Sequence, residues 1–194
     1  MKYLCMKETP SALWNKFKQA LSEELTDTPL EQLEKAWEEK RTTFYRQVMI
    51  PAVADRMNLI FKDEKLNRVD YVLYKKAANG YEIPVIAIES ENDCTRCEEE
   101  VEKLCCLNLP LKVLFLAMEW NDATRQEQIN DSWQYIFAAN NEVYKLDGYF
   151  GFVIWNSLDS KFHCFAFNEE GEIIDQDQVL HDCYCTSADT KSVI

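Results

Sequence analysis

The chain has 194 residues, of which 47% are hydrophobic and 28% charged, with four glycines and a formal net charge of −13. This length allows one domain with a sizeable core, so we expect a single domain over 1–194. So few glycines argue against a glycine-rich phosphate loop, and the negative charge opposes nucleic-acid binding, which depends on neutralising phosphates.

Two helices are predicted before the first strand. Thr9-Pro10 is typical of a helix start, and an apolar face follows it to about residue 25. Thr28-Pro29-Leu30-Glu31 repeats this signature with a glutamate three residues after the cap. It predicts a long helix whose apolar face reaches Val48, and Pro51 is expected to kink or interrupt that helix.

Three strands are predicted next. Residues 58–62 are expected to form a short strand. Residues 69–75 alternate and are rich in β-branched and aromatic types, and residues 83–90 form a short apolar run. Asn79-Gly80 marks a turn between them, so the last two strands are predicted to form a hairpin.

This hairpin carries three carboxylates. Glu89 and Glu91 point the same way, because side chains alternate faces along a strand, and the neighbouring strand is expected to bring Asp70 to that end. Carboxylates that converge without a basic partner repel one another, and a divalent cation is the usual remedy. The alternatives are a solvated loop entrance for the two glutamates and a surface ion pair of Asp70 with Arg68, worth little.

A helix, a buried strand and a further helix are predicted beyond the hairpin. Thr95 and Glu98 form a capping box for a helix that runs to about residue 108. Residues 111–118 form the clearest buried strand of the sequence. Asp122 is expected to cap a helix that extends to about residue 140.

The last third is predicted to be an antiparallel hairpin of residues 149–156 and 161–168, followed by a polar, acidic tail. The tail, 176–194, has no firm periodicity, which favours partial disorder. The hairpin holds more aromatic residues than one face needs: Tyr149, Phe150, Phe152, Trp155, Phe162, Phe165 and Phe167. They fit a sheet covered on both sides, a dimer interface or a platform for stacking bases, and the scarcity of nearby Lys and Arg favours packing or a homodimer.

The order of these elements predicts an α/β fold with a mixed central sheet flanked by helices. The core is expected at about 28–120, with the N-terminal helix at 9–25 before it and the C-terminal helix and antiparallel hairpin at 122–175 after it.

A long helix, a strand bearing Asp, a strand ending in Glu-x-Glu, a helix and a buried strand together resemble the restriction-endonuclease-like superfamily, the PD-(D/E)xK nucleases. The resemblance covers about residues 30–118. It implies a restriction-endonuclease-like core in which Asp70 and Glu89 bind Mg²⁺ or Mn²⁺. It also implies a glutamate from the first core helix in the site; helical phase places Glu38 nearer the apolar face than Glu39, and Glu34 is the alternative. Glu91 stands at the family's lysine position, as in some DNA-cleaving members, and Val69 stands at its proline.

The same resemblance implies a Mg²⁺-dependent nuclease that hydrolyses phosphodiester bonds of nucleic acid. Glu91 would orient or deprotonate the attacking water, and Lys75 or Lys76 would contact backbone phosphates. A local basic cluster near the carboxylates fits such a substrate: Lys62, Lys65, Arg68, Lys75 and Lys76. The alternative is a catalytically inactive member of the same fold that acts as a protein-interaction or dimerisation module, which the acidic charge favours.

The cysteines allow a metal–thiolate site as well. Cys94-x-x-Cys97 and Cys183-x-Cys185 could supply four thiolates to zinc or an iron–sulfur cluster, whereas the helical position of Cys97 and Cys105 favours core cysteines. His163 is expected to be a packed or surface histidine. No apolar run approaches the roughly 18–20 residues of a membrane span, so we expect a cytoplasmic protein with no membrane partner and with reduced thiols.

Overall fold

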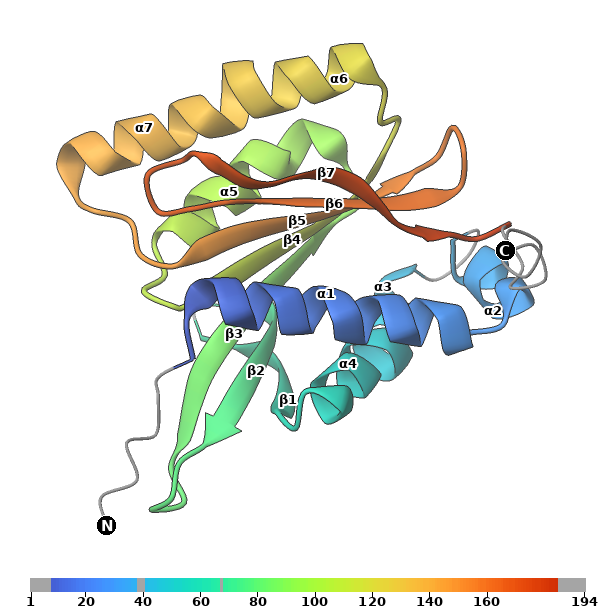
Figure 1. The fold of residues 1–194 in the computed structure, drawn as a ribbon, viewed down its shortest axis with the longest axis horizontal. Helices are drawn as coiled ribbons and strands as arrows, with labels where there is room; N and C mark the ends of the chain where they lie inside the picture. Colours follow the sequence, from blue (N-terminus) through green and yellow to red (C-terminus); the bar gives the residue numbers. More distant parts are fainter. Residues whose placement is uncertain (1–7, 38–40, 67, 185–194) are drawn as a thin grey trace, which may run out of the picture.

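A seven-stranded mixed sheet forms the centre of the computed structural model, which describes residues 8–37, 41–66 and 68–184 (Figure 1). The strands lie side by side in chain order: β1 Ile60–Lys65, β2 Val69–Lys76, β3 Glu82–Glu91, β4 Leu111–Met118, β5 Tyr149–Asn156, β6 Lys161–Phe167 and β7 Ile173–Asp182. Strands β1 to β3 and β5 to β7 pair antiparallel, whereas β4 is parallel to both β3 and β5. The predicted α/β fold with a mixed sheet is confirmed.

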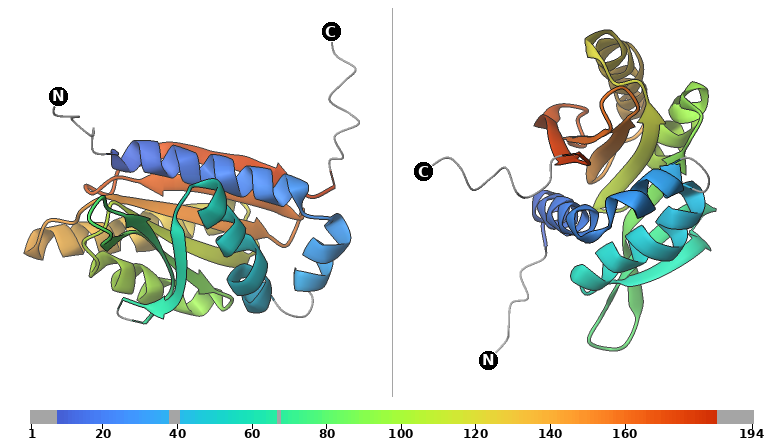
Figure 2. Two further views of the ribbon diagram at one scale, coloured as in Figure 1. Left: turned by 90° about the horizontal axis from the view of Figure 1, so that it is seen from below. Right: turned by 90° about the vertical axis from the view of Figure 1, so that its right-hand side faces the viewer.

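Helices cover both faces of the sheet (Figure 2). They are α1 Pro10–Asp27, α2 Leu30–Lys35, α3 Arg41–Phe44, α4 Ile50–Arg56, α5 Cys97–Cys105, α6 Asp122–Gln126 and α7 Gln134–Val143. The N-terminal helices pack on one face, where Phe17 and Ile50 share a core with Phe115. Helices α5 to α7 pack on the other face, where Val101 and Phe137 share a second core with Leu114. Among the described residues, no helix is long and apolar enough to cross a membrane.

Local signals place the first helix and the central strand. The Thr9 hydroxyl accepts a hydrogen bond from the Ala12 amide at 3.2 Å, and Pro10 occupies the first turn, so α1 begins where the sequence predicts. Strand β4 spans the predicted 111–118. It is buried on both faces because crossover helices follow β3 and β4, and this accounts for its nearly continuous apolar sequence.

The long helix predicted after Thr28 changes its pitch near the proline. Within the described residues it comprises α2 and then α3, a π-helical turn at Tyr45–Met49, and α4. Pro51 has no N–H to donate, and in a regular α-helix its ring would clash with the carbonyl four residues earlier. The wider π-helical turn just before it accommodates the missing hydrogen bond and the ring. Residues 38–40 lie outside the described residues.

The first part of the polar tail belongs to β7, an edge strand paired with β6. Three register shifts in this pairing break the alternation that sequence reasoning looks for. The anchors of β7 are also polar: Asp175 accepts hydrogen bonds from the Trp14 indole at 2.7 Å and from Lys18 at 2.5 Å. Residues 185–194 lie outside the described residues.

The aromatic side chains of β5 and β6 fill the protein's own core. Phe150, Phe152, Phe162, Phe165 and Phe167 are each at most 1% exposed. The expected sheet covered on both sides is confirmed, and these five rings are not available for a base-stacking platform or a dimer interface.

Candidate carboxylate site

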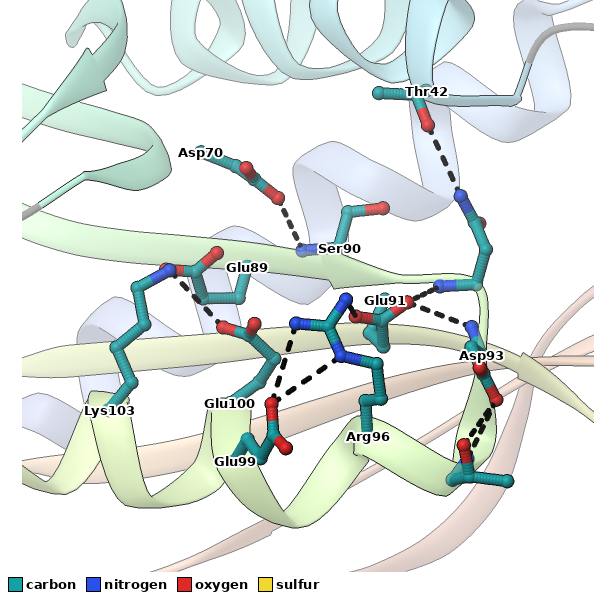
Figure 3. Close-up of polar contacts among 12 residues, drawn as sticks. Thr42, Asp70, Glu89, Ser90, Glu91, Asp93, Arg96, Glu99, Glu100 and Lys103 are labelled. Carbon is teal, nitrogen blue, oxygen red and sulfur yellow. Dashed lines mark hydrogen bonds and ion pairs between the residues drawn. The ribbon is translucent and has the colours of Figure 1, made fainter.

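Asp70 and Glu89 lie at neighbouring ends of β2 and β3 (Figure 3). The register pairs Tyr71 with Ile88, so Asp70 and Glu89 are the next residues on the two strands. The Ser90 amide donates a hydrogen bond to Oδ2 of Asp70 at 3.0 Å. The backbone of β3 therefore fixes the Asp70 carboxylate beside Glu89, as the sequence predicts.

Glu89 is a buried carboxylate. Its side chain is 2% exposed and faces α5, because β3 pairs it with Leu114 of the core on that side of the sheet. Oε1 of Glu89 lies 2.5 Å from Nζ of Lys103, yet it accepts no hydrogen bond of good geometry in the described structure. Burial raises the pKa of Glu89 to about 8, Asp70 and Glu100 add to this rise, and Lys103 opposes it.

Lys103 of α5 lies between two glutamates. Besides Glu89, its Nζ contacts Oε2 of Glu100 at 3.2 Å, because residues three apart share a helix face. Burial lowers the pKa of Lys103, but the two glutamates outweigh this effect and raise its pKa above the usual value. Sequence reasoning missed Lys103, although a lysine three residues after Glu100 on the helix that follows β3 is a signal for it.

Glu91 serves the loop that leads from β3 into α5. Its Oε1 accepts hydrogen bonds from the amides of Asn92 at 2.7 Å and Asp93 at 2.8 Å, and its Oε2 lies 3.9 Å from Arg96. The chain turns here, and the Glu91 carboxylate supplies an acceptor for two amides of the turn. Asp93 in turn accepts from the Thr95 amide at 3.0 Å, so Thr95 does not cap α5, whose N-cap is Arg96.

In the conformation described, Glu91 therefore contacts its own loop and does not join Asp70 and Glu89. Within residues 8–37, 41–66 and 68–184, no group of three or more His, Cys, Asp or Glu side chains is arranged to hold a metal ion. Glu38 and Glu39 lie outside the described residues, and Glu34 of α2 is exposed. Helix α3 contacts the loop that follows β3, since the side chain of Asn92 donates to the Thr42 hydroxyl at 3.2 Å.

Lys75 and Lys76 lie toward the opposite end of β2 from Asp70. At about 3.3 Å per residue, the two lysines are about 16–20 Å along the strand from Asp70. Lys75 also contacts Oε2 of Glu8 at 3.1 Å. The structure does not bring these lysines to the carboxylates.

The cysteines and histidines do not form a metal centre in the described structure. Cys97 and Cys105 are buried in the core beneath α5, which confirms the prediction of core cysteines, and burial raises the pKa of Cys105 to about 12. Cys183 packs against the core on the other face of the sheet, so it is separated from Cys97. Cys185 and the side chain of Cys94 lie outside the described part of the structure. His163 is packed, with Nδ1 at 3.3 Å from Asp177.

The Asp70–Glu89 pair supplies two of the oxygen ligands that a hard divalent cation would need. Mg²⁺ prefers oxygen ligands and is usually held by one or two carboxylates together with water and substrate phosphate. Glu89 offers a buried oxygen without a well-aligned donor, and Asp70 lies on the adjoining strand.

No protein-family model matches this chain, and no curated protein matches its sequence.

Proposed function

We propose that this protein is a Mg²⁺-dependent nuclease with a restriction-endonuclease-like core, which hydrolyses phosphodiester bonds of nucleic acid. The observation that carries the proposal is the Glu89 carboxylate, 2% exposed, beside Asp70 at the ends of two paired strands. Burying a carboxylate without full hydrogen bonding costs several kcal/mol, on the order of a domain's net stability, and such groups concentrate at functional sites.

The order of elements around this pair supports the same proposal. Antiparallel strands β1 to β3 follow the N-terminal helices, and α5 then leads to β4, which is parallel to β3. Asp70 stands on β2 and Glu89 near the end of β3, which are the places that the resemblance to PD-(D/E)xK nucleases implies.

The proposed chemistry divides between the carboxylates and the surrounding groups. A bound Mg²⁺ would polarise the scissile phosphodiester and lower the pKa of an attacking water. Asp70 and Glu89 would hold that ion, with Glu38 as a further carboxylate. Glu91 would keep the Asn92–Asp93 turn in place beside the reacting groups, and with its second oxygen it would orient the water.

Lys75 and Lys76 would contact the substrate away from the scissile bond. Their distance of about 16–20 Å along β2 corresponds to about five or six nucleotides of a strand. They would offset part of the net charge of −13 where the backbone lies on the hairpin.

Titration calorimetry with Mn²⁺ tests this function. The wild-type protein is expected to bind Mn²⁺, and Glu89→Gln and Asp70→Asn are each expected to weaken binding at least about tenfold, because each removes one charged ligand. Glu99→Gln is the matched control, since Glu99 lies on the exposed side of α5 with Arg96 at 3.4 Å. Cleavage of labelled DNA and RNA should likewise be weakened by Glu89→Gln and Asp70→Asn but not by Glu99→Gln, and EDTA should stop it. Mn²⁺ binding that is unchanged by both substitutions would contradict the proposal.

The alternative is an inactive member of the same fold that binds another protein. Two observations favour it: Lys103 already neutralises Glu89, and Glu91 contacts its own loop. A folded wild-type protein that binds neither Mn²⁺ nor nucleic acid would support this alternative.

A further inference from the structure

Strands β2 and β3 continue past the body of the sheet as a two-stranded arm, residues 75–83 (Figure 1). Strand β1 pairs with β2 only as far as Tyr74, and β4 pairs with β3 only from Ile86 onward. Within the described part of the structure, the arm therefore has no neighbouring strand on either side. Every residue of the arm except Ala77 is exposed, so its side chains are available to a partner.

The exposed side chains of the arm combine large apolar groups with lysines. Tyr81 is 73% exposed and Ile83 is 53% exposed. The register pairs Ile83 with Lys75 across the two strands, and Tyr81 lies two residues before Ile83, so these three side chains share one face of the arm. Lys76 is also exposed and points to the other face. The arm therefore offers apolar contact on one face and positive charge on both.

The backbone edges of the arm are protected against pairing with a further strand. Pro84, on β3 between the arm and the body of the sheet, has no N–H to donate. Lys75 and Lys76 stand on β2, and lysines on an exposed strand oppose edge-to-edge association. A partner is therefore met by the side chains of the arm and not by strand addition.

The side chains and the shape of the arm favour duplex DNA as that partner. Lysine is depleted in contacts between proteins, whereas it commonly binds the phosphates of nucleic acids. A two-stranded ribbon fits the major groove of B-DNA, which is about 12 Å wide, but not the deep and narrow major groove of an RNA duplex.

The arm also separates its lysines from much of the acidic charge of the protein. Asp70 lies about 16–20 Å from them along β2, which is about twice the screening length of about 8 Å at physiological salt. Lys75 contacts Oε2 of Glu8 at 3.1 Å, but Lys16 contacts the same carboxylate. Lys75 can therefore turn to a phosphate without leaving Glu8 unpaired. Glu82, the acidic residue of the arm itself, is paired with Lys62.

We propose that the arm enters the major groove of duplex DNA, where Lys75 and Lys76 contact phosphates and Tyr81 and Ile83 meet the edges of the bases. Because the two lysines lie on opposite faces of the ribbon, each faces one wall of the groove. This inference rests on the proposed function for the choice of a nucleic-acid substrate, but the contact itself requires no metal ion.

Fluorescence anisotropy with a labelled DNA duplex of two helical turns, in EDTA, tests the lysines. The double variant Lys75→Gln/Lys76→Gln is expected to weaken binding at least about tenfold at low salt, because two phosphate contacts are lost. The slope of log K against log salt should fall by about two. Lys35→Gln/Lys145→Gln is the matched control: it removes the same charge from two exposed lysines of other elements and should bind like wild type.

Tyr81→Ser separates the apolar contact from the charge. It is expected to weaken DNA binding about fivefold with an unchanged salt slope, because no phosphate contact is removed. Tyr135→Ser is the matched control, since Tyr135 of α7 is 72% exposed and lies outside the arm. An RNA duplex of the same sequence is expected to bind wild type at least about tenfold more weakly than the DNA duplex.

The outcomes separate the arm from the nuclease, because binding is measured in EDTA and cleavage with Mg²⁺. Wild type that does not bind in EDTA, or arm variants that bind like wild type, overturn the role of the arm, and cleavage with Mg²⁺ then leaves the nuclease standing. Binding through the arm without cleavage upholds the arm and contradicts the nuclease. Absence of both overturns both proposals.

Two further results would overturn insertion of the arm into DNA. Equal affinities for the DNA and RNA duplexes would contradict entry into the major groove. Self-association of the protein that Tyr81→Ser abolishes, in the absence of DNA binding, would assign the arm to a second copy of the chain. Sedimentation velocity of wild type and Tyr81→Ser measures this.

Discussion

Gly151→Ala is expected to lower the free energy of unfolding by about 2–3 kcal/mol, because the added methyl group overfills the core. Alanine is ordinarily better than glycine inside a strand by roughly 0.5–1 kcal/mol, so the sign of the change is itself informative. A Cβ at position 151 of β5 would lie 2.4 Å from Cζ3 of Trp14, well inside van der Waals contact.

Trp14 has little freedom to move away from Gly151. Its side chain is 1% exposed, its indole N–H donates to Asp175 at 2.7 Å, and its ring stacks on Phe17 with centroids 6.1 Å apart. The methyl group would therefore push α1 away from the sheet. In a chain of this size the melting temperature should fall by about 5–10 °C in thermal denaturation.

A double-mutant cycle with Trp14→Leu provides the control. If the clash is the cause, Gly151→Ala should cost much less in the Trp14→Leu background, since the ring is no longer there. Gly80→Ala is a further reference, because Gly80 has φ of +86° and nothing within 4 Å of an added Cβ. It should cost only the backbone strain of about 1–2 kcal/mol. Additive effects in the cycle would refute the packing explanation.

The fold could be predicted where local chemistry and burial agree. The cap at Thr9 and the continuous apolar run of β4 both carry their signal within a few residues. Strand β7 could not be predicted, because an edge strand exposes half of its residues and its anchor, Asp175, bonds to Trp14, which is 161 residues away. No hydrophobic periodicity marks the π-helical turn before Pro51. The sequence therefore predicts an interruption of the helix near this proline, but not the form that the interruption takes.

Part of the candidate site could also be predicted from the sequence, and part of it could not. The pairing of Asp70 with Glu89 follows from strand alternation and hairpin register, which the sequence contains. The contacts of Glu91 depend on the loop conformation after β3, and the contact of Lys103 depends on how α5 packs over that strand. Those are tertiary features, and side-chain periodicity does not encode them.

Lys112 is a fully buried lysine that takes no part in the proposed site. It lies in β4 and is 0% exposed, with its ammonium donating to the Asp147 carbonyl and 4.0 Å from the centroid of the Phe150 ring. Burial lowers its pKa from 10.5 to about 8, although Cys105, Asp147 and Glu169 oppose this shift. A lysine with this change on folding destabilises the protein by about 3 kcal/mol at neutral pH.

Lys112→Met is therefore expected to raise the free energy of unfolding at pH 7 by about 1–3 kcal/mol, because methionine fills the same space without a charge. The lower end of this range allows for the lost contacts with the Asp147 carbonyl and the Phe150 ring. Urea denaturation of wild type, Lys112→Met and the surface control Lys145→Met measures the difference.

The pH dependence gives this prediction its second check. Below about pH 8 both the folded and the unfolded wild type carry the proton on Lys112, so the cost is fully present. Between about pH 8 and 10.5 the folded state has released this proton and the unfolded state has not, so wild-type stability should rise with pH relative to Lys112→Met. The advantage of the methionine variant should therefore shrink across this range, whereas Lys145→Met retains Lys112 and should show the rise in stability with pH. A methionine variant that is less stable than wild type at pH 7 would mean that the carbonyl and ring contacts outweigh the desolvation of the ammonium.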